Sequence, residues 1–142
     1  MTDVTALVLA AGAGRRYGGP KALARSVDGT PWLTAVTGTL ASIGLESVAV
    51  LPRTHTQAAD LLPPGAQPLF VDTFDEGIGA SLRAALAFLS STDARAALIA
   101  LVDQPTLPGV FVARLLTPSA GPGARLETVL RRAVFDGRPG HP

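Results

Sequence analysis

The sequence contains no cysteine and only 2 histidines in 142 residues. The lack of cysteine excludes disulfide bonds, cysteine-ligated metal centres and a cysteine nucleophile, and two histidines are too few for a histidine-rich metal site. Charged residues are also scarce at 16%, and 12 basic against 11 acidic side chains leave a formal net charge of +1. Binding of nucleic acid through a generally basic surface is therefore not expected. Any functional site must be built from backbone groups, carboxylates, arginine, lysine and hydroxyls.

Long apolar runs are missing as well. The longest runs, such as residues 6–11 and 96–102, fall far short of the roughly 18 residues that cross a bilayer. The first positive charges follow the apolar N-terminal stretch, whereas in a secretory signal they precede it. We therefore expect a cytoplasmic protein with no membrane partner. The chain is 47% apolar, which is enough for a buried core, and its length predicts a single domain over residues 1–142.

Short apolar runs alternate along the chain with stretches of helical periodicity. Strands are predicted at residues 4–10, 46–51, 67–71 and 96–102. Helices are predicted at residues 31–43, with Thr30 as cap and Gly44 as stop, and at 54–62, 79–90 and 109–116. The first and last strand segments are uninterrupted apolar runs, which is typical of parallel strands buried on both faces. The alternation predicts a Rossmann-like α/β fold, a three-layer sandwich with a mostly parallel central sheet, in which ligands bind beyond the carboxyl ends of the strands.

A glycine-rich segment follows the first predicted strand. Residues 12–19 hold four glycines in eight positions, which lets successive backbone N–H groups point into one concavity, an arrangement that binds phosphate. No acidic residue occurs between Val4 and Val27, whereas four basic side chains lie within eleven positions: Arg15, Arg16, Lys21 and Arg25. This local charge favours a small polyanion such as a nucleoside triphosphate. The alternative is a flexible surface loop with solvated arginines.

Two common nucleotide-binding motifs do not fit this segment. A Walker A loop needs Gly-Lys-Ser/Thr, but Lys21 lies between Pro20 and Ala22. A dinucleotide fingerprint could begin at Gly12, but Tyr17 occupies its third glycine position, and no acidic residue ends the second strand. An NAD-binding oxidoreductase is therefore the weaker alternative.

The segment instead resembles the signature of the MobA-like nucleotidyltransferases, an LAAG turn followed by x-G/S-x-R-x-G-x-x-K. The matching residues are Leu9, Ala10, Ala11, Gly12, Gly14, Arg16, Gly18 and Lys21, and all of them except Gly18 are the nucleotide contacts that the resemblance predicts. The spacing of five from Arg16 to Lys21 is similar to that of the molybdenum cofactor cytidylyltransferase branch. The resemblance implies a fold like that of the nucleotide-diphospho-sugar transferases.

Three later segments carry the same resemblance. Residues 71–82 are similar to a polar strand end followed by G-x-x-x-S-L, residues 101–107 to a D-Q-P-x-L metal motif, and residues 136–142 to a G-x-P-G-H-P turn. The resemblance implies nucleotide contacts for Asp72 and Ser81, Mg²⁺ binding by Asp103, and acceptor-side positions for Gly140 and His141. From the residues alone, Ser81 also fits a helix cap, Asp72 an ordinary loop residue, and Asp103 an Asx-turn.

The activity that the resemblance implies is transfer of CMP from CTP to the terminal phosphate of a molybdopterin-type cofactor, with release of pyrophosphate. The amides of residues 12–18 and Arg16 would bind the β- and γ-phosphates, Lys21 the α-phosphate and Asp103 the Mg²⁺, which makes these three side chains the predicted catalytic residues. Members of the family continue well beyond the GHP turn, so a domain lacking its C-terminal part is expected. The alternatives are a catalytically impaired nucleotide-binding fragment and another acceptor, such as a sugar phosphate, and the oligomeric state stays open.

Overall fold

The computed structural model describes residues 3–72, 76–117, 134–135 and 138–139. Four parallel strands form the central sheet, in the order β3-β2-β1-β4. Their bounds are Val4–Leu9 (β1), Ser47–Pro52 (β2), Ala66–Val71 (β3) and Ala96–Leu101 (β4). Two further strands of two residues each, Val134–Phe135 (β5) and Arg138–Pro139 (β6), pair antiparallel with one another. The predicted parallel sheet is therefore confirmed.

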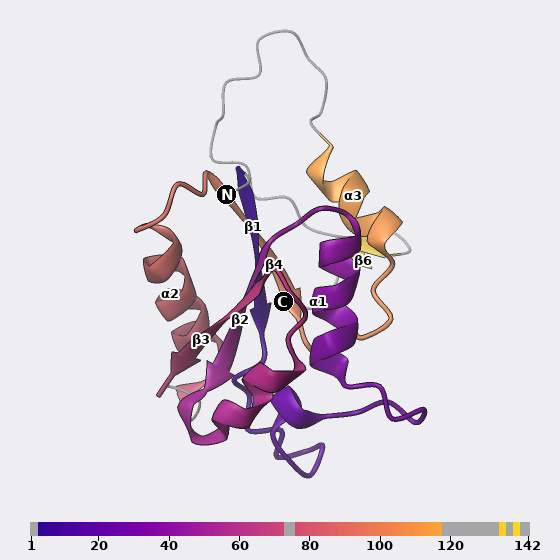
Figure 1. The fold of residues 1–142 in the computed structure, drawn as a ribbon, viewed down its shortest axis with the longest axis vertical. Helices are drawn as coiled ribbons and strands as arrows, with labels where there is room; N and C mark the ends of the chain where they lie inside the picture. The colour runs from indigo at the N-terminus through magenta and orange to yellow at the C-terminus, as the bar shows by residue number, and fades with distance from the viewer. Residues whose placement is uncertain (1–2, 73–75, 118–133, 136–137, 140–142) are drawn as a thin grey trace, which may run out of the picture.

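Helices cover both faces of the sheet. On one face lie α1 (Trp32–Ser42) and α3 (Gly109–Leu116), and on the other lies α2 (Ile78–Leu89) (Figure 1). Two 3-10 helices, η1 (Lys21–Leu23) and η2 (Arg53–Leu61), lie at the end of the sheet where the strands finish. This arrangement is the predicted three-layer sandwich. Among the described residues, no helix combines the length and the apolar character needed to span a membrane.

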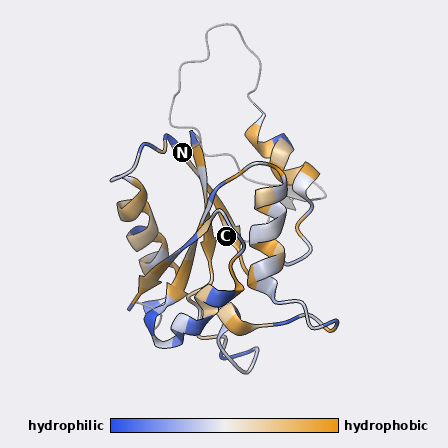
Figure 2. Cartoon of the chain, in the orientation of Figure 1, coloured by the Kyte–Doolittle hydropathy of each residue, from blue (hydrophilic) through white to orange (hydrophobic). Residues whose placement is uncertain are grey.

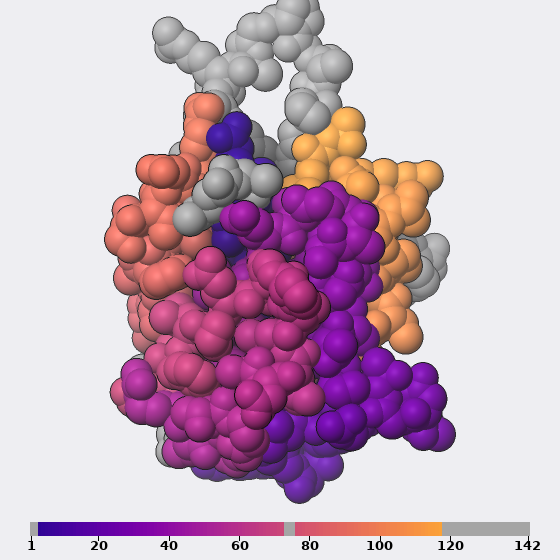
Figure 3. Space-filling view, in the orientation of Figure 1, coloured from indigo at the N-terminus to yellow at the C-terminus, as the bar shows by residue number. Residues whose placement is uncertain are grey.

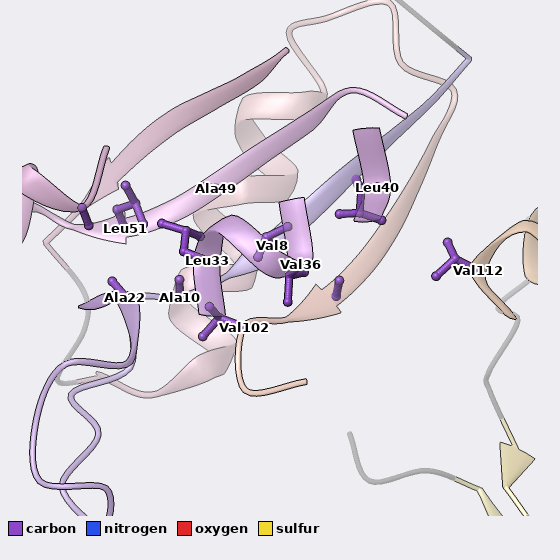
Figure 4. Close-up of a cluster of buried hydrophobic side chains, with 13 residues drawn as sticks. Val8, Ala10, Ala22, Leu33, Val36, Leu40, Ala49, Leu51, Val102 and Val112 are labelled. Carbon is purple, nitrogen blue, oxygen red and sulfur yellow. The ribbon is translucent and has the colours of Figure 1, made fainter. Parts of the chain in front are cut away.

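The side-chain alternation of β1 separates the core into two clusters, one on each face of the sheet. Leu7 and Leu9 point toward α2 and pack with Ala85 and Leu89. The alternate residues of β1 point toward α1, where Figure 4 shows the side chains of α1 gathered against those of the strands. Figure 2 shows the hydrophobic colour concentrated on the strands and on the helices that cover them. In the space-filling view, the first half of the chain packs directly between α2 and α3 (Figure 3).

The first helix begins later than predicted. Its N-cap is Pro31 rather than Thr30, and no side-chain hydrogen bond caps it. The amide of Thr30 instead donates to the carboxylate of Asp28 at 2.9 Å, and this hydrogen bond lowers the pKa of Asp28 below its usual value. At its other end the helix stops as predicted, because Gly44 adopts a φ of 80°, which glycine tolerates best.

The segment predicted as a helix at 54–62 is a 3-10 helix over Arg53–Leu61, with a non-helical kink at His55. Pro52 precedes it and Pro63 follows closely, so the segment has little room for a stable α-helical turn.

The prediction that β4 is buried on both faces is wrong. Ala96, Ala97 and Ile99 are exposed, with 45% of Ile99 accessible to solvent. The cause is its position, since within the described residues β4 pairs only with β1 and forms an edge of the sheet. An apolar run therefore predicted the strand correctly but not how many neighbours would cover it.

Candidate functional site

The carboxyl ends of β1 and β4 border a pocket of about 400 Å³. Its walls come from these strand ends, from the glycine loop (residues 10–20) and from the start of α2. The lining residues are Leu9, Ala11, Gly12, Ala13, Gly14, Arg15, Lys21, Gly77, Ile78, Ser81, Leu101, Val102 and Asp103. Small-molecule sites in proteins have volumes of roughly 300–1,000 Å³. The pocket therefore has both the size and the place in the fold that a ligand site in a parallel sheet requires.

The glycine loop folds around the carbonyl oxygen of Gly14. That oxygen accepts hydrogen bonds from the amides of Tyr17 and Gly18, both at 2.9 Å, and of Gly19 at 3.3 Å. These three amides are therefore not available to a phosphate. Of the amides of residues 12–18 that were predicted to bind phosphate, those of Tyr17 and Gly18 are thus excluded. The amides of residues 12–14 donate to no acceptor among the described residues, and all three residues line the pocket. Unpaired amides of this kind are suitable donors to an anion.

Lys21 and Asp103 meet in the wall of this pocket. The Lys21 Nζ donates to the Asp103 Oδ2 at 2.7 Å, and the two side chains are 35% and 37% exposed. The Lys21 amide donates to the Gly12 carbonyl at 3.4 Å, and the Val102 amide donates to the Leu9 carbonyl at 3.2 Å. The backbone thus holds both residues beside the end of β1. The described structure gives the Asp103 carboxylate a lysine partner and no backbone amide, so it contains no Asx-turn at this residue.

Ser81 lies in the first turn of α2 and lines the pocket with only 4% of its surface exposed. It does not cap the helix, because the N-cap is Gly77, which has a φ of 87° and no side-chain cap bond. Within the described part of the chain, the Ser81 hydroxyl has no hydrogen-bond partner. This leaves a hydroxyl at the pocket wall that is available to a ligand.

Three of the predicted nucleotide contacts do not line the pocket. The Ala10 side chain, 1% exposed, lies in the cluster on the α1 face, because side chains alternate along a strand. The Asp72 carboxylate accepts a hydrogen bond of 2.8 Å from the Arg53 Nε at the end of β3, on the far side of β2 from the pocket. Arg16 is exposed on the glycine loop. Gly140 and His141 lie outside the described residues.

Arg15 lines the pocket, although the motif had pointed to its neighbour Arg16. The density of basic residues in the loop was the signal for both, but it did not indicate which one faces inward. Arg25, counted with them in the sequence, donates instead to the Gly29 carbonyl at 2.9 Å. The contributions of Gly77 and Ile78 were also missed, because they follow from the direction in which α2 begins.

This site suits a divalent cation only when a bound ligand supplies part of the cation's coordination. The described residues contain no cluster of three or more acidic, histidine or cysteine side chains, and Asp103 is the one carboxylate among them that lines the pocket. Mg²⁺ is commonly bound through one or two carboxylates, with phosphate oxygens and water as the remaining ligands. The donor set therefore suits a cation that arrives with a phosphate compound, and does not suit a permanently caged ion.

The family model of the MobA-like NTP transferase domain matches residues 6–142. This chain belongs to that family. The match extends from the interior of β1 through the whole of the pocket, so the MobA-like domain includes every residue that lines it.

Solved structures of similar proteins agree with the fold of this MobA-like domain. Rv0371c from Mycobacterium tuberculosis H37Rv is 29% identical, with a TM-score of 0.64 over 81% of this chain and 59% of its own. Its homologue from Mycobacterium sp. strain JC1 is 31% identical, with a TM-score of 0.65 over 80% of this chain and 57% of its own. The chain thus spans less than two thirds of the length of these neighbours.

Two further comparisons bear on the MobA-like domain. A structure of Rv0371c in complex with manganese is 26% identical, with a TM-score of 0.62 over 81% of this chain and 58% of its own. The 4-diphosphocytidyl-2C-methyl-D-erythritol synthase from Anaerococcus prevotii DSM 20548 shares the fold at 13% identity, with a TM-score of 0.58 over 80% of this chain and 48% of its own. Among curated protein sequences, none matches the chain.

In this MobA-like domain, an aromatic contact ties the glycine loop to α1. The rings of Tyr17 and Trp32 lie 4.9 Å apart at an angle of 49°, and the Tyr17 hydroxyl donates to the Arg25 carbonyl at 3.4 Å. Tyr17 is 48% exposed and lies one residue after Arg16. The contact attaches the outer turn of the loop to the start of α1, and we expect it to help position the amides of residues 12–14.

We expect Tyr17→Ala to weaken nucleoside triphosphate binding by about 2- to 10-fold, because an aromatic pair contributes about 0.5–1.5 kcal/mol. Tyr17→Phe keeps the ring and should bind like the wild type. The chain has 1 tryptophan and 1 tyrosine, so Trp32 fluorescence reports this contact directly during a titration. Equal affinities of the Ala and Phe variants, measured by calorimetry, would contradict the role of the ring.

Proposed function

We propose that this domain is a nucleotidyltransferase that transfers CMP from CTP to the phosphate of a molybdopterin-type acceptor and releases pyrophosphate. The observation that carries the proposal is the 2.7 Å contact between Lys21 and Asp103 in a pocket lined by the glycine loop. One site thereby provides a cation for phosphate, a carboxylate for metal and unpaired amides for anionic oxygens. Membership of the MobA-like NTP transferase family supports nucleotidyl transfer in general.

In this proposal the triphosphate lies along the glycine loop. The amides of residues 12–14 donate to its oxygens, and Arg15, which lines the pocket, neutralises its negative charge. Arg16 is assigned the β- and γ-phosphates, as the family motif implies, and reaches them from the exposed side of the loop. The absence of acidic residues between Val4 and Val27 supports this assignment, since no carboxylate of the loop opposes the polyanion.

Asp103 would hold the divalent cation through its carboxylate. The metal supplies neutralisation of charge on the triphosphate and helps to orient it. The manganese complex of Rv0371c supports a divalent ion in a similar fold, and Mg²⁺ is the ion we propose here. The position of Asp103 directly beyond β4 gives the carboxylate a rigid attachment.

The reaction is an in-line displacement at the α-phosphorus. A phosphate oxygen of the acceptor forms a bond to that phosphorus while its bond to the bridging oxygen breaks, and pyrophosphate leaves with the electron pair. Lys21 neutralises charge on the α-phosphate as it develops, which is the larger part of what a protein contributes to such a transfer. Ser81, whose hydroxyl has no hydrogen-bond partner among the described residues, would orient the nucleotide from the start of α2.

The choice of CTP and of a molybdopterin-type acceptor rests on the five-residue spacing from Arg16 to Lys21. Leu9 and Ile78 add an apolar surface to the pocket beside Ser81, which suits a base and its ribose. A cytosine is small enough to share this volume of about 400 Å³ with the rest of the nucleotide.

A pyrophosphate-release assay with the four nucleoside triphosphates tests this function. With Mg²⁺ and a molybdopterin-type acceptor we expect release from CTP, and at least tenfold less from ATP, GTP and UTP, since tenfold corresponds to about 1.4 kcal/mol of discrimination. A sugar phosphate serves as the competing acceptor. Binding of CTP without release would identify a nucleotide-binding module, and neither binding nor release with any triphosphate would refute the proposal.

A further inference from the structure

We propose that Lys21 and a divalent cation are alternative partners of the Asp103 carboxylate, and that the triphosphate exchanges one for the other. Without nucleotide the lysine then competes with metal for the carboxylate, and metal binds more tightly together with the nucleotide. This inference rests on the proposed function in assigning the triphosphate and the metal to one pocket.

The ammonium of Lys21 lies where a metal ion bound to Asp103 would also lie. Its Nζ lies 2.7 Å from the Asp103 Oδ2, and a Mg²⁺ ion bound to the same oxygen would lie at about 2.0–2.1 Å. An ammonium group and a divalent cation at these distances from one oxygen would repel each other strongly. Either one can therefore occupy this side of the carboxylate, but not both.

The ion pair between Lys21 and Asp103 is weak enough for a metal ion to replace the lysine. The two side chains are 35% and 37% exposed, so water screens their attraction. Among the described residues no backbone donor contacts the pair, in contrast to a buried and fully hydrogen-bonded pair. The contact therefore lowers the affinity for metal without abolishing metal binding.

The Lys21 side chain can leave Asp103 without a change of fold. Its backbone is fixed by the bond from its amide to the Gly12 carbonyl and by the Ala24 amide, which donates to the Lys21 carbonyl at 3.2 Å. The side-chain stem passes beside Gly12, where an added Cβ would lie 3.9 Å from the Lys21 Cδ. Rotation of the side chain alone therefore carries the ammonium toward the unpaired amides where the phosphates would bind.

The charge around Asp103 changes when a triphosphate binds. Among the described residues that line the pocket, the ammonium of Lys21 is the group that contacts the Asp103 carboxylate. Without a nucleotide this ammonium opposes a divalent cation at the same carboxylate. A bound triphosphate adds several negative charges, gives Lys21 a new partner and provides oxygen ligands for the metal. Metal and nucleotide should therefore bind with positive coupling, each raising the affinity of the other by the same factor.

Titration with Mn²⁺ alone, followed by electron paramagnetic resonance or calorimetry, tests the exchange without any catalytic turnover. We expect Lys21→Met, which keeps the aliphatic stem, to tighten Mn²⁺ binding by about 3- to 10-fold in the absence of nucleotide. The Asp103→Asn change added to Lys21→Met should remove this gain. With CTP present and no acceptor, Mn²⁺ should bind more tightly to the wild type, and the advantage of Lys21→Met should shrink.

The matched control is Arg53→Met, which removes a different ion pair, Arg53 with Asp72, outside the pocket. It should leave Mn²⁺ affinity unchanged, and thermal unfolding confirms that each variant is folded. Unchanged Mn²⁺ affinity in folded Lys21→Met would overturn the inference, as would an equal gain in Arg53→Met. If the gain appears but CTP neither binds nor affects Mn²⁺, the proposed function fails while the competition for Asp103 stands.

Discussion

Replacing Asp103 with asparagine should lower the rate of nucleotidyl transfer by roughly 10²–10³-fold, the loss expected when one preorganised charged contact is removed. Asparagine keeps the shape of the side chain but supplies a neutral oxygen, which is a poor partner for a divalent cation and for Lys21. The measurement is kcat/KM for pyrophosphate release at saturating Mg²⁺. Thermal stability should change little, because the Lys21–Asp103 pair is more than one third exposed on each side.

Asp93→Asn provides the control for this prediction. Asp93 is an exposed carboxylate in the turn before β4, at the opposite end of the strand from Asp103. The Asp93→Asn change alters the net charge of the protein by the same amount as Asp103→Asn, so any general effect of charge on nucleotide affinity appears in both variants. Similar losses in the two variants, or full activity in Asp103→Asn, would show that Asp103 is not the metal-binding carboxylate.

The elements of the fold that could be predicted from sequence are those fixed by local pattern. The apolar run of β1 and the left-handed Gly44 after α1 each follow from a physical preference of the residues involved. The exposure of β4 could not be predicted in the same way, because it depends on how many neighbours the strand has. A run such as residues 96–101 has the same composition whether it lies at the centre or at the edge of a sheet.

In the candidate site, too, the features set by local sequence could be predicted and those set by the tertiary structure could not. The position of Asp103 after an apolar strand and the glycine content of the loop pointed to the correct end of the sheet. Which arginine faces the pocket, and which amides remain unpaired, depends on the path of the loop, which the Gly14 carbonyl determines by accepting three amides. The pairing of Lys21 with Asp103 spans 82 positions, and no local pattern contains it.

The path of the loop also makes Gly14 the residue whose substitution should most affect nucleotide binding. Its φ is 61°, and an added Cβ would lie 1.8 Å from the Gly19 carbonyl oxygen, which is inside van der Waals contact. A side chain at this position must therefore open the turn, in addition to the roughly 1–2 kcal/mol that a left-handed conformation costs a residue other than glycine. We expect Gly14→Ala to weaken CTP binding by roughly 10- to 100-fold in calorimetric titrations.

Gly19→Ala tests whether this effect comes from the turn or from glycine content alone. Gly19 lies in the same loop, but a Cβ there meets nothing within 4 Å, and its φ is not in the left-handed region. It should bind CTP within about 2-fold of the wild type, since a substitution without steric conflict usually changes free energies by less than about 0.5 kcal/mol. Equal losses in both variants would mean that CTP binding depends on the flexibility that glycine gives the loop. A loss in Gly14→Ala alone would mean that CTP binding depends on the closed turn, which directs the amides of residues 12–14 into the pocket.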